Sequence, residues 1–282
     1  MHWTSPGHSA KLAFMIELLE RAERFRALHQ RPEPLLLPNP WDAGSARLLA
    51  HLGFEALATT SLGVANMHGQ KRASAEAILE NVRAISAATD LPVSADLENG
   101  YADDPGEAAA MVARACECGA VGASIEDYTG DPSRPLYDFA HAVERVQAAV
   151  EVARRLPVPF VFTARAEGRL RSRAPLEETI ARLQAFEKAG ADVLYAPALR
   201  NIAEMRAVIE AVQRPVNVVM GLAEPSITLE QLREAGVRRV SIGGAFSRVA
   251  LRAMLDAARE MKAGRFTFAA NMASVDELYA AF

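Results

Sequence analysis

Hydrophobic and polar positions follow one repeating unit along most of the chain: an amphipathic helix, a glycine or proline, and a short apolar strand. At Gly53, Gly119, Gly190 and Gly236 a predicted helix ends at a glycine just before the apolar run. Glycine suits this position because the residue that follows a helix often takes a left-handed backbone. The pattern predicts strands at residues 35–37, 54–60, from Val93 onward, 121–126, 159–165, 192–197, 216–220 and 239–243. It predicts helices at residues 12–29, 43–52, 76–88, 105–118, 139–155, 176–188, 202–212, 228–235, 249–262 and 275–282.

Eight strands that alternate with helices predict an α/β protein with a parallel sheet. At 282 residues the natural closed form of such a sheet is a (β/α)8 TIM barrel. We expect one domain over residues 1–282, with an N-terminal helix, the barrel at about 35–260 and extra C-terminal helices at about 261–282. A doubly wound open sheet is the alternative, but no G-x-G-x-x-G signature follows an early strand.

The composition narrows the class of protein. Hydrophobic residues make up 50% of the chain, charged residues 23%, and the net charge of −4 gives no basic surface for nucleic acid. No apolar run is long enough to span a membrane, and residues 1–11 lack the apolar segment of a secretion signal. Cys116 and Cys118 are the only cysteines, too few for a zinc site or a disulfide framework. We therefore expect a cytoplasmic protein that contacts neither nucleic acid nor membrane.

The barrel prediction locates the chemistry, because active sites of this fold lie at the C-terminal ends of the strands. Polar or charged residues stand at most of the predicted ends, and three consecutive ends are charged. They are Asn39 and Asp42, Thr60 and Ser61, Asp96 and Glu98, Glu126 and Asp127, Arg165 and Glu167, and the turn Gly243-Gly244.

Asp96 and Glu98 are two residues apart and would point to the same face while the strand persists. Two like charges aimed at one point favour a hard cation such as Mg2+, although acids that simply face solvent are the alternative. Arg165 could hold a substrate carboxylate bidentately, or it could form a rim ion pair with Glu126.

Several motifs resemble the isocitrate lyase/phosphoenolpyruvate mutase superfamily. They are "LLLPNPWDAGSARLLAHLGFEALATTSLGVA", "SADLENGY", "GASIEDY", "FTARAEG" and "PVNVVMGLAEPSITLEQLREAGVRRVSIGGAFSRVALRAM", in the order of the family and across residues 35–254. The resemblance implies a barrel whose Mg2+, with Mn2+ as a substitute, assists bond cleavage or formation next to a 2-oxo acid or its enolate. It also implies a homotetramer, a dimer of dimers, whose C-terminal helices swap between paired subunits.

The resemblance assigns roles by position. Asp96, Glu98 and Glu126 match the metal-site acids, with Glu98 standing where many members have aspartate, and Arg165 matches the arginine that grips the substrate. Substrate contacts are implied for Thr60, Ser61 and Leu62, which match a carboxylate-binding segment, and for Trp41 and Asp42, which match a segment beside the substrate.

The chain also departs from the best-known members. Its loop at residues 128–138 has no cysteine, histidine or lysine, where the lyases carry a catalytic cysteine and the phosphonomutases a lysine and an asparagine. Residues 68–72 contain no acid, and the segment "YAPALRN" has neither the glutamate nor the histidine of those enzymes. Neither of these two chemistries is therefore expected.

What remains is a Mg2+-dependent lyase for a small 2-oxo or 2-hydroxy carboxylate, which breaks a C–C bond or decarboxylates through an enolate. Tyr128, Tyr137 or Arg134 on the loop could close over the substrate, and Tyr128 or Tyr137 could carry the proton. The alternatives are a phosphonopyruvate-type C–P bond enzyme and a non-catalytic 2-oxo acid-binding protein. A Schiff-base aldolase is excluded because no candidate strand ends in lysine. An apolar strip with Leu251 and Met254 after the barrel predicts a homo-oligomer.

Overall fold

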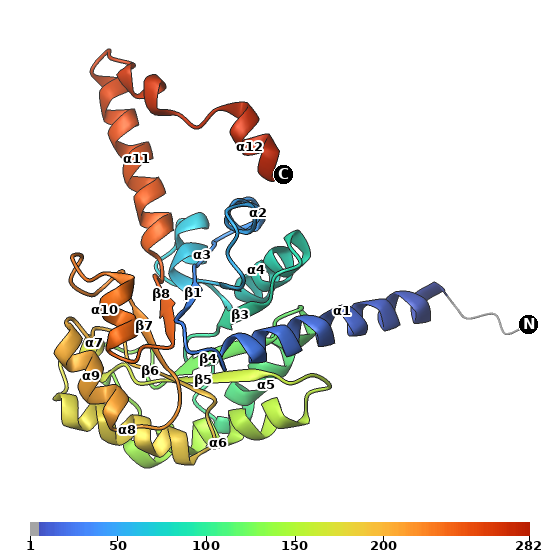
Figure 1. Ribbon diagram of the computed structural model, residues 1–282, viewed down its shortest axis with the longest axis vertical. Helices are drawn as coiled ribbons and strands as arrows, with labels where there is room; N and C mark the ends of the chain where they lie inside the picture. Colours follow the sequence, from blue (N-terminus) through green and yellow to red (C-terminus); the bar gives the residue numbers. More distant parts are fainter. Residues whose placement is uncertain (1–5) are drawn as a thin grey trace, which may run out of the picture.

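Eight parallel strands form the centre of the computed structural model, which describes residues 6–282 (Figure 1). The strands are β1 (Leu35–Leu37), β2 (Leu57–Ala58), β3 (Val93–Asp96), β4 (Gly122–Glu126), β5 (Val161–Arg165), β6 (Val193–Tyr195), β7 (Val216–Val219) and β8 (Arg239–Ser241). They pair in the order β1-β8-β7-β6-β5-β4-β3-β2, so each strand from β2 to β7 pairs with the next one along the chain, and β8 pairs with β1. The predicted (β/α)8 barrel is confirmed, and a doubly wound sheet is excluded because the order never reverses.

The barrel closes between β1 and β2 without a regular strand ladder. The backbone amide of Ala58 donates to the carbonyl oxygen of Pro38 at 3.0 Å, and Asn39 Nδ2 donates to the carbonyl oxygen of Thr59 at 3.0 Å. Asn39 Oδ1 accepts in turn from the amides of Ile242 and Gly243, at 3.0 and 2.9 Å. One buried asparagine therefore joins the ends of β1, β2 and β8.

Helices surround the barrel and extend beyond it. They are α1 (Pro6–Leu28), α2 (Ala43–His51), α3 (Ser61–Met67), α4 (Ala75–Ala88), α5 (Pro105–Glu117), α6 (Phe139–Arg155), α7 (Gly168–Arg171), α8 (Leu176–Lys188), α9 (Ile202–Glu210), α10 (Leu229–Glu234), α11 (Ala245–Lys262), the 3-10 helix η1 (Thr267–Asn271) and α12 (Val275–Ala281). The predicted helix-ending glycines all have positive φ: 84° at Gly53, 98° at Gly119, 101° at Gly190 and 85° at Gly236. The pattern missed the short helices α3 and α7, because each begins directly after a strand end.

The N-terminal end of the barrel is filled by α1. Phe25 is fully buried there, and a Cβ added to Gly122 would lie 2.7 Å from Phe25 Cε1. A side chain on Gly122 and the ring of Phe25 therefore compete for the same space, and glycine leaves that space to the helix.

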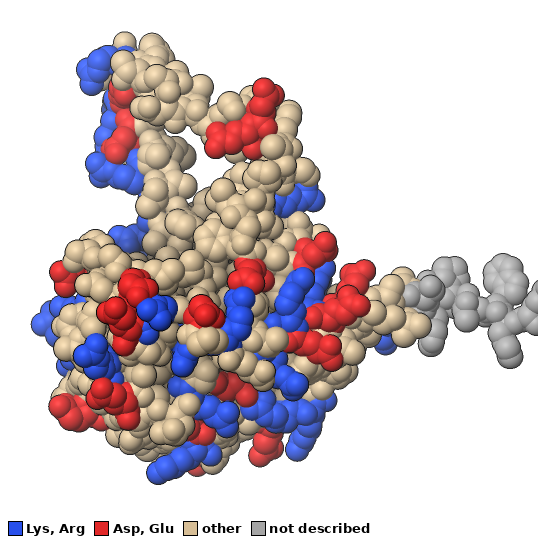
Figure 2. Space-filling model, in the orientation of Figure 1, with Lys and Arg blue, Asp and Glu red and all other residues tan. Residues whose placement is uncertain are grey.

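The last two helices form an arm, residues 245–282, that leaves the opposite end of the barrel (Figure 1). Helix α11 projects outward, and α12 returns to pack on α2, where Arg47 Nη1 donates to the carbonyl oxygen of Phe282 at 3.1 Å. The arm exposes large apolar side chains, including Val249 at 66% and Tyr279 at 71%. Figure 2 shows mostly uncharged side chains where α11 borders the gap within this arm, whereas acidic side chains border the gap on the side of α12. Within the part of the chain described here, no helix has both the length and the apolar character to cross a membrane.

Candidate active site at the C-terminal ends of the strands

A cavity of about 460 Å³ opens at the C-terminal ends of the strands, as the barrel prediction required. Residues that follow β2 through β8 all contribute to its lining. Those used below are Thr60, Ser61, Leu62, Lys71, Arg72, Asp96, Glu98, Glu126, Tyr128, Arg165, Arg171, Tyr195 and Arg248.

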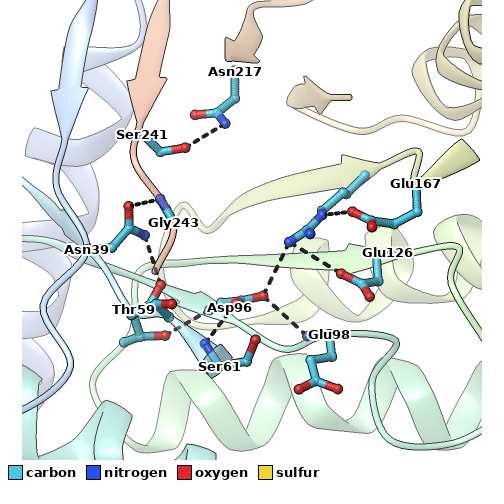
Figure 3. A network of polar contacts seen from close by, with 12 residues as sticks. Asn39, Thr59, Ser61, Asp96, Glu98, Glu126, Glu167, Asn217, Ser241 and Gly243 are labelled. Carbon is cyan, nitrogen blue, oxygen red and sulfur yellow. Dashed lines mark hydrogen bonds and ion pairs between the residues drawn. The ribbon is translucent and has the colours of Figure 1, made fainter. Parts of the chain in front are cut away.

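Asp96 ends β3 and is fixed at the floor of the cavity. Its amide donates to Thr59 Oγ1 at 2.9 Å, and its Oδ2 accepts from the amide of Ser61 at 2.9 Å (Figure 3). Its other carboxylate oxygen, Oδ1, lies 3.8 Å from Arg165 Nη1. The β2 and β3 ends thus hold one carboxylate in a single orientation, with one oxygen turned toward the arginine.

Arg165 ends β5 and joins three acids. Its Nη1 lies 3.3 Å from Glu126 Oε2, and its Nε donates to Glu167 Oε1. Burial alone would lower the pKa of Arg165, but Glu126 and Glu167 raise it well above its ordinary value. The ring of Tyr195 lies under the guanidinium, 4.9 Å from ring centroid to Cζ. The rim ion pair expected as an alternative is therefore present, and Arg165 faces the cavity at the same time.

Glu126 ends β4 and is 5% exposed. Burial raises the pKa of this carboxyl group well above its ordinary value, Arg165 lowers it in part, and Glu167 and Asp96 raise it again. Asp96, Glu126 and Glu167 therefore share one arginine at this end of the barrel, although the whole cavity lining carries more basic than acidic side chains. A cation bound next to Glu126 would favour the ionised form of its carboxyl group.

Glu98 lies after the end of β3, with a left-handed backbone at φ 47°. Its Oε2 pairs with Arg72 Nε at 2.5 Å, and its carboxylate points away from Asp96 (Figure 3). Burial, and then Asp96, raise the pKa of Glu98, while Arg72 opposes that rise. Asp96 and Glu98 therefore do not share one face as expected, because the strand has already ended at Asp96.

No group of three Asp, Glu, His or Cys side chains in residues 6–282 is close enough to hold a metal ion by itself. Mg2+ in proteins is commonly bound by one or two carboxylates, with water and substrate oxygens completing its six ligands. Asp96 and Glu126 are oxygen donors of that kind, and Glu98 lines the same cavity with its carboxylate paired to Arg72. The residues present therefore fit a divalent-metal site, and the predicted metal set stays a prediction.

The family profile described as phosphoenolpyruvate phosphomutase matches residues 25–262. The chain belongs to the isocitrate lyase/phosphoenolpyruvate mutase superfamily. The predicted resemblance is thus confirmed over most of the chain.

Three relatives place the chain within this superfamily. An uncharacterized protein of Mycobacterium tuberculosis (strain ATCC 25618 / H37Rv) is 33% identical over 85% of this chain and 89% of its own length. The 2-methylisocitrate lyase of Escherichia coli (strain K12) is 28% identical over 76% of this chain and 75% of its own. An oxaloacetate decarboxylase of Pseudomonas savastanoi pv. phaseolicola is 30% identical over 84% and 83%.

Two solved structures of the superfamily are also similar. A candidate lyase or mutase from Burkholderia cenocepacia J2315 has a TM-score of 0.91 and 51% identity, and covers 94% of this chain and 96% of its own. Oxaloacetate acetylhydrolase in complex with the product oxalate has a TM-score of 0.82 and 26% identity, over 92% and 93%. The fold therefore extends to superfamily enzymes named for small carboxylic acids.

The substrate-binding residues implied by the superfamily divide into two groups. Thr60, Ser61 and Leu62 line the cavity at the start of α3, where Thr60 Oγ1 accepts from the amide of Gly63 at 3.3 Å. Trp41 and Asp42 do not line it. Asp42 caps α2 by accepting from the Ser45 amide at 2.7 Å, and Trp41 packs on Gly63 through its Cβ. These last two support the wall of the cavity from behind.

The two predicted proton-carrying tyrosines also separate. Tyr128 lines the cavity, and the guanidinium of Arg171 stacks on its ring at 4.2 Å. Tyr137 is 4% exposed and lies outside the cavity lining; its hydroxyl donates to Asp103 Oδ1 at 2.6 Å and accepts from Asn99 Nδ2 at 3.0 Å. The structure therefore does not bring Tyr137 to the site, because its hydroxyl anchors the 128–138 loop to the loop between β3 and α5.

Sequence reasoning missed five cavity residues of this superfamily member: Lys71, Arg72, Arg171, Tyr195 and Arg248. Tyr195 is the last residue of β6, but the predicted strand ran on to residue 197, so the sequence pattern did not mark Tyr195 as a strand end. Burial raises its pKa to about 12, so the phenol stays protonated at neutral pH. Lys71 and Arg72 come from the loop after α3, Arg171 from α7 and Arg248 from α11, and no local pattern indicates that these segments approach the cavity.

Proposed function

We propose that this protein is a divalent-metal-dependent carbon–carbon lyase for a small 2-oxo or 2-hydroxy carboxylate, with an oxaloacetate-like dicarboxylate as the first candidate. The observation that carries the proposal is the meeting of Asp96, Glu126 and Arg165 at three adjacent strand ends in one cavity. Relatives named 2-methylisocitrate lyase and oxaloacetate decarboxylase support the same reaction class.

The substrate would be held by two kinds of group. Arg165 presents a permanently charged guanidinium to a carboxylate, and Glu126 and Glu167 fix the direction in which it points. Thr60 to Leu62 offer a hydroxyl and backbone groups in the same cavity. Asp96, with Glu126 and Glu98, would hold Mg2+ or Mn2+, which supplies Lewis-acid stabilisation of negative charge on the 2-oxo group.

The proposed proton carrier differs from the one expected from the sequence. In decarboxylation of an oxaloacetate-like acid, the bond from C3 to the distal carboxylate breaks, CO2 leaves, and C3 takes up a proton. Tyr195 is a neutral phenol in the cavity and can donate that proton, with Tyr128 at the mouth as a second phenol. Tyr137 has no such access, because its hydroxyl is engaged by Asp103 and Asn99.

A second candidate rests on the charge of the cavity mouth. Lys71, Arg72, Arg171 and Arg248 add four basic side chains to the lining, which would also suit a phosphonate dianion. The match to the phosphoenolpyruvate phosphomutase profile also supports a C–P bond enzyme. A protein that binds 2-oxo acids without turnover would use the same contacts.

We also propose a homo-oligomer assembled through the arm at residues 245–282. Val249, Met254, Met261 and Phe266 are each at least 58% exposed, an apolar surface that a partner subunit would cover. Swapping of the arm between subunits and the tetramer are parts of this proposal.

The deciding experiment is an assay of turnover with and without metal. The enzyme is stripped with a chelator and offered oxaloacetate, 2-methylisocitrate, 2-oxoglutarate and phosphonopyruvate, before and after Mg2+ is restored. We expect pyruvate and CO2 from oxaloacetate only with metal, and loss of turnover in Asp96→Asn. Asp90→Asn is the matched control, because the Asp90 side chain is fully exposed on the body of the protein.

The outcomes separate the candidates. Metal-dependent turnover of phosphonopyruvate alone would replace the lyase by the C–P enzyme. Metal-dependent binding of a 2-oxo acid, measured by calorimetry without turnover, would favour the binding protein. Turnover that survives both the chelator and Asp96→Asn would refute the site as described.

A further inference from the structure

The interior of the barrel below the active site is polar. Barrels of this kind usually fill that space with layers of branched apolar side chains. Here a second, smaller chamber of about 40 Å³ lies under the first cavity. Its lining includes Asn39, Thr59, Ser94, Ser124, Asn217, Arg239 and Ser241, and it shares Asp96, Arg165, Tyr195 and Gly243 with the cavity above.

The charged group in this chamber is Arg239 of β8, which is 4% exposed. Its Nη1 donates to Thr163 Oγ1 at 3.0 Å, and its Nε is buried without a hydrogen-bond partner. Within residues 6–282, no carboxylate forms an ion pair with this guanidinium. Burial lowers the pKa of Arg239 to about 10, which leaves it charged at neutral pH.

An unpaired buried charge is costly, and proteins compensate it with an opposite charge. The one acid that lines the chamber is Asp96. Its two oxygens already face the amide of Ser61 and the guanidinium of Arg165. The positive charge of Arg239 therefore lacks a compensating group from the described chain.

The other polar atoms of the chamber include unused donors. The hydroxyls of Ser94 and Ser124 make no hydrogen bond to any other group in the described chain, although both side chains line the chamber. Asn217 Nδ2 donates to Ser241 Oγ at 3.0 Å, and Asn217 Oδ1 is buried without a donor (Figure 3). Two hydroxyl donors and a guanidinium can surround an anion, while Asn217 Oδ1 can accept from a neighbouring water.

We propose that this chamber is a binding site for a small monovalent inorganic anion of halide size, held by Arg239 with the hydroxyls of Ser94 and Ser124. The volume of about 40 Å³ has room for such an ion with a water molecule and is too small for a dicarboxylate. The ion enters through the active-site cavity, whose floor is the ceiling of the chamber. The proposal is independent of which reaction the upper cavity performs.

Bromide diffraction tests the site directly. Crystals of the full-length protein are transferred to bromide, and the anomalous difference map is calculated. We expect a peak within hydrogen-bond distance of the Arg239 guanidinium, and its loss in Arg239→Met. Arg238→Met is the matched control, because Arg238 reaches the carbonyl oxygen of Pro32 outside the barrel, and its crystals should keep the peak. A wild-type chamber that holds only water at saturating bromide would overturn the proposal.

Thermal unfolding tests the same site in solution. Chloride is titrated at constant ionic strength, with gluconate as the bulky balancing anion. Because a ligand that binds only the folded state stabilises it, a tenfold excess over Kd should raise Tm by about 3 °C in the wild type and in Arg238→Met. Arg239→Met should show no such rise, and an equal rise there would contradict the assignment.

A second variant keeps the test decisive if Arg239→Met does not fold. Ser94→Ala/Ser124→Ala removes the two hydroxyl donors and retains the arginine. We expect the chloride concentration needed for half of the Tm rise to increase at least tenfold in this double variant. An unchanged chloride dependence would show that the anion does not occupy the chamber.

Discussion

Replacing Arg165 by methionine tests the electrostatic account of the active site. The change keeps an unbranched apolar stem and removes the charge that faces Glu126 and Glu167, both of which are buried. Removing one partner of a buried ion pair costs about 3–5 kcal/mol, because the other partner is left without compensation. With about 2–4 °C of Tm per kcal/mol, we expect Tm to fall by roughly 6–20 °C at neutral pH.

The pH dependence of this loss is the sharper part of the prediction. Burial already raises the pKa of Glu126 well above its ordinary value, and Arg165 opposes that rise. Without Arg165 the pKa rises further, so the folded state binds a proton that the unfolded state releases. The free energy of unfolding then falls as pH rises from the unfolded pKa, about 4.3, through the folded pKa. The gap in Tm between variant and wild type should therefore be wider at pH 8 than at pH 5.

The measurement is thermal unfolding followed by circular dichroism from pH 5 to pH 8 in one buffer series. Arg154→Met is the control, because it removes an arginine from the half-exposed pair with Asp192. Such surface pairs contribute about 0–1 kcal/mol, so this variant should show a small loss without pH dependence. A pH-independent gap in Arg165→Met, or a loss no larger than that of the control, would refute the reasoning.

Three further predictions follow from the placement of particular residues. Tyr195→Phe should lower kcat by about 10²–10⁴-fold in the turnover assay, whereas Tyr137→Phe should leave kcat within about twofold and lower stability by roughly 1–2 kcal/mol; the reverse order would contradict the assigned roles. Deleting residues 263–282 should reduce the number of subunits per particle, measured by light scattering relative to the mass of the shortened chain, because the truncated arm loses apolar surface such as Tyr279; an unchanged number of subunits would exclude that part of the arm from the interface. Gly122→Ala should destabilise the protein by about 1–3 kcal/mol in denaturant titrations, since its Cβ would lie 2.7 Å from the Phe25 ring, and Phe25→Leu should recover part of that loss; purely additive losses would argue against the shared space.

The barrel itself was predictable because it depends on local signals that repeat. A glycine such as Gly119 ends a helix, an apolar run follows, and the charged residue that closes the run marks the rim of the barrel. Asp96, Glu126 and Arg165 were found in this way, since each is the last residue of its strand. At these positions the end of the apolar run in the sequence coincides with the end of the strand at the rim of the barrel.

The remaining parts of the site depend on contacts between distant loops. Glu98 was expected beside Asp96, but the chain leaves β3 and takes left-handed backbone at Glu98 and Tyr101. Its partner Arg72 comes from the loop after α3, 26 residues earlier, and no spacing rule connects the two. Tyr137 was chosen for its place in a loop, and only the folded structure shows its hydroxyl turned to Asp103.

The junction between β1 and β2, which lacks a backbone hydrogen-bond ladder, affects how the barrel could open. Seven of the eight strand boundaries are held by backbone ladders, whereas this junction depends on one backbone hydrogen bond and the amide of Asn39. The Asn39 side chain also accepts hydrogen bonds from the backbone amides of Ile242 and Gly243, so one side chain joins the two sides of the active-site mouth. If the rim of this barrel widens when a ligand enters, the hydrogen bonds of Asn39 to Thr59, Ile242 and Gly243 are the ones that must break. The segments before α3 and α11 would then move together, because both are held by this one side chain.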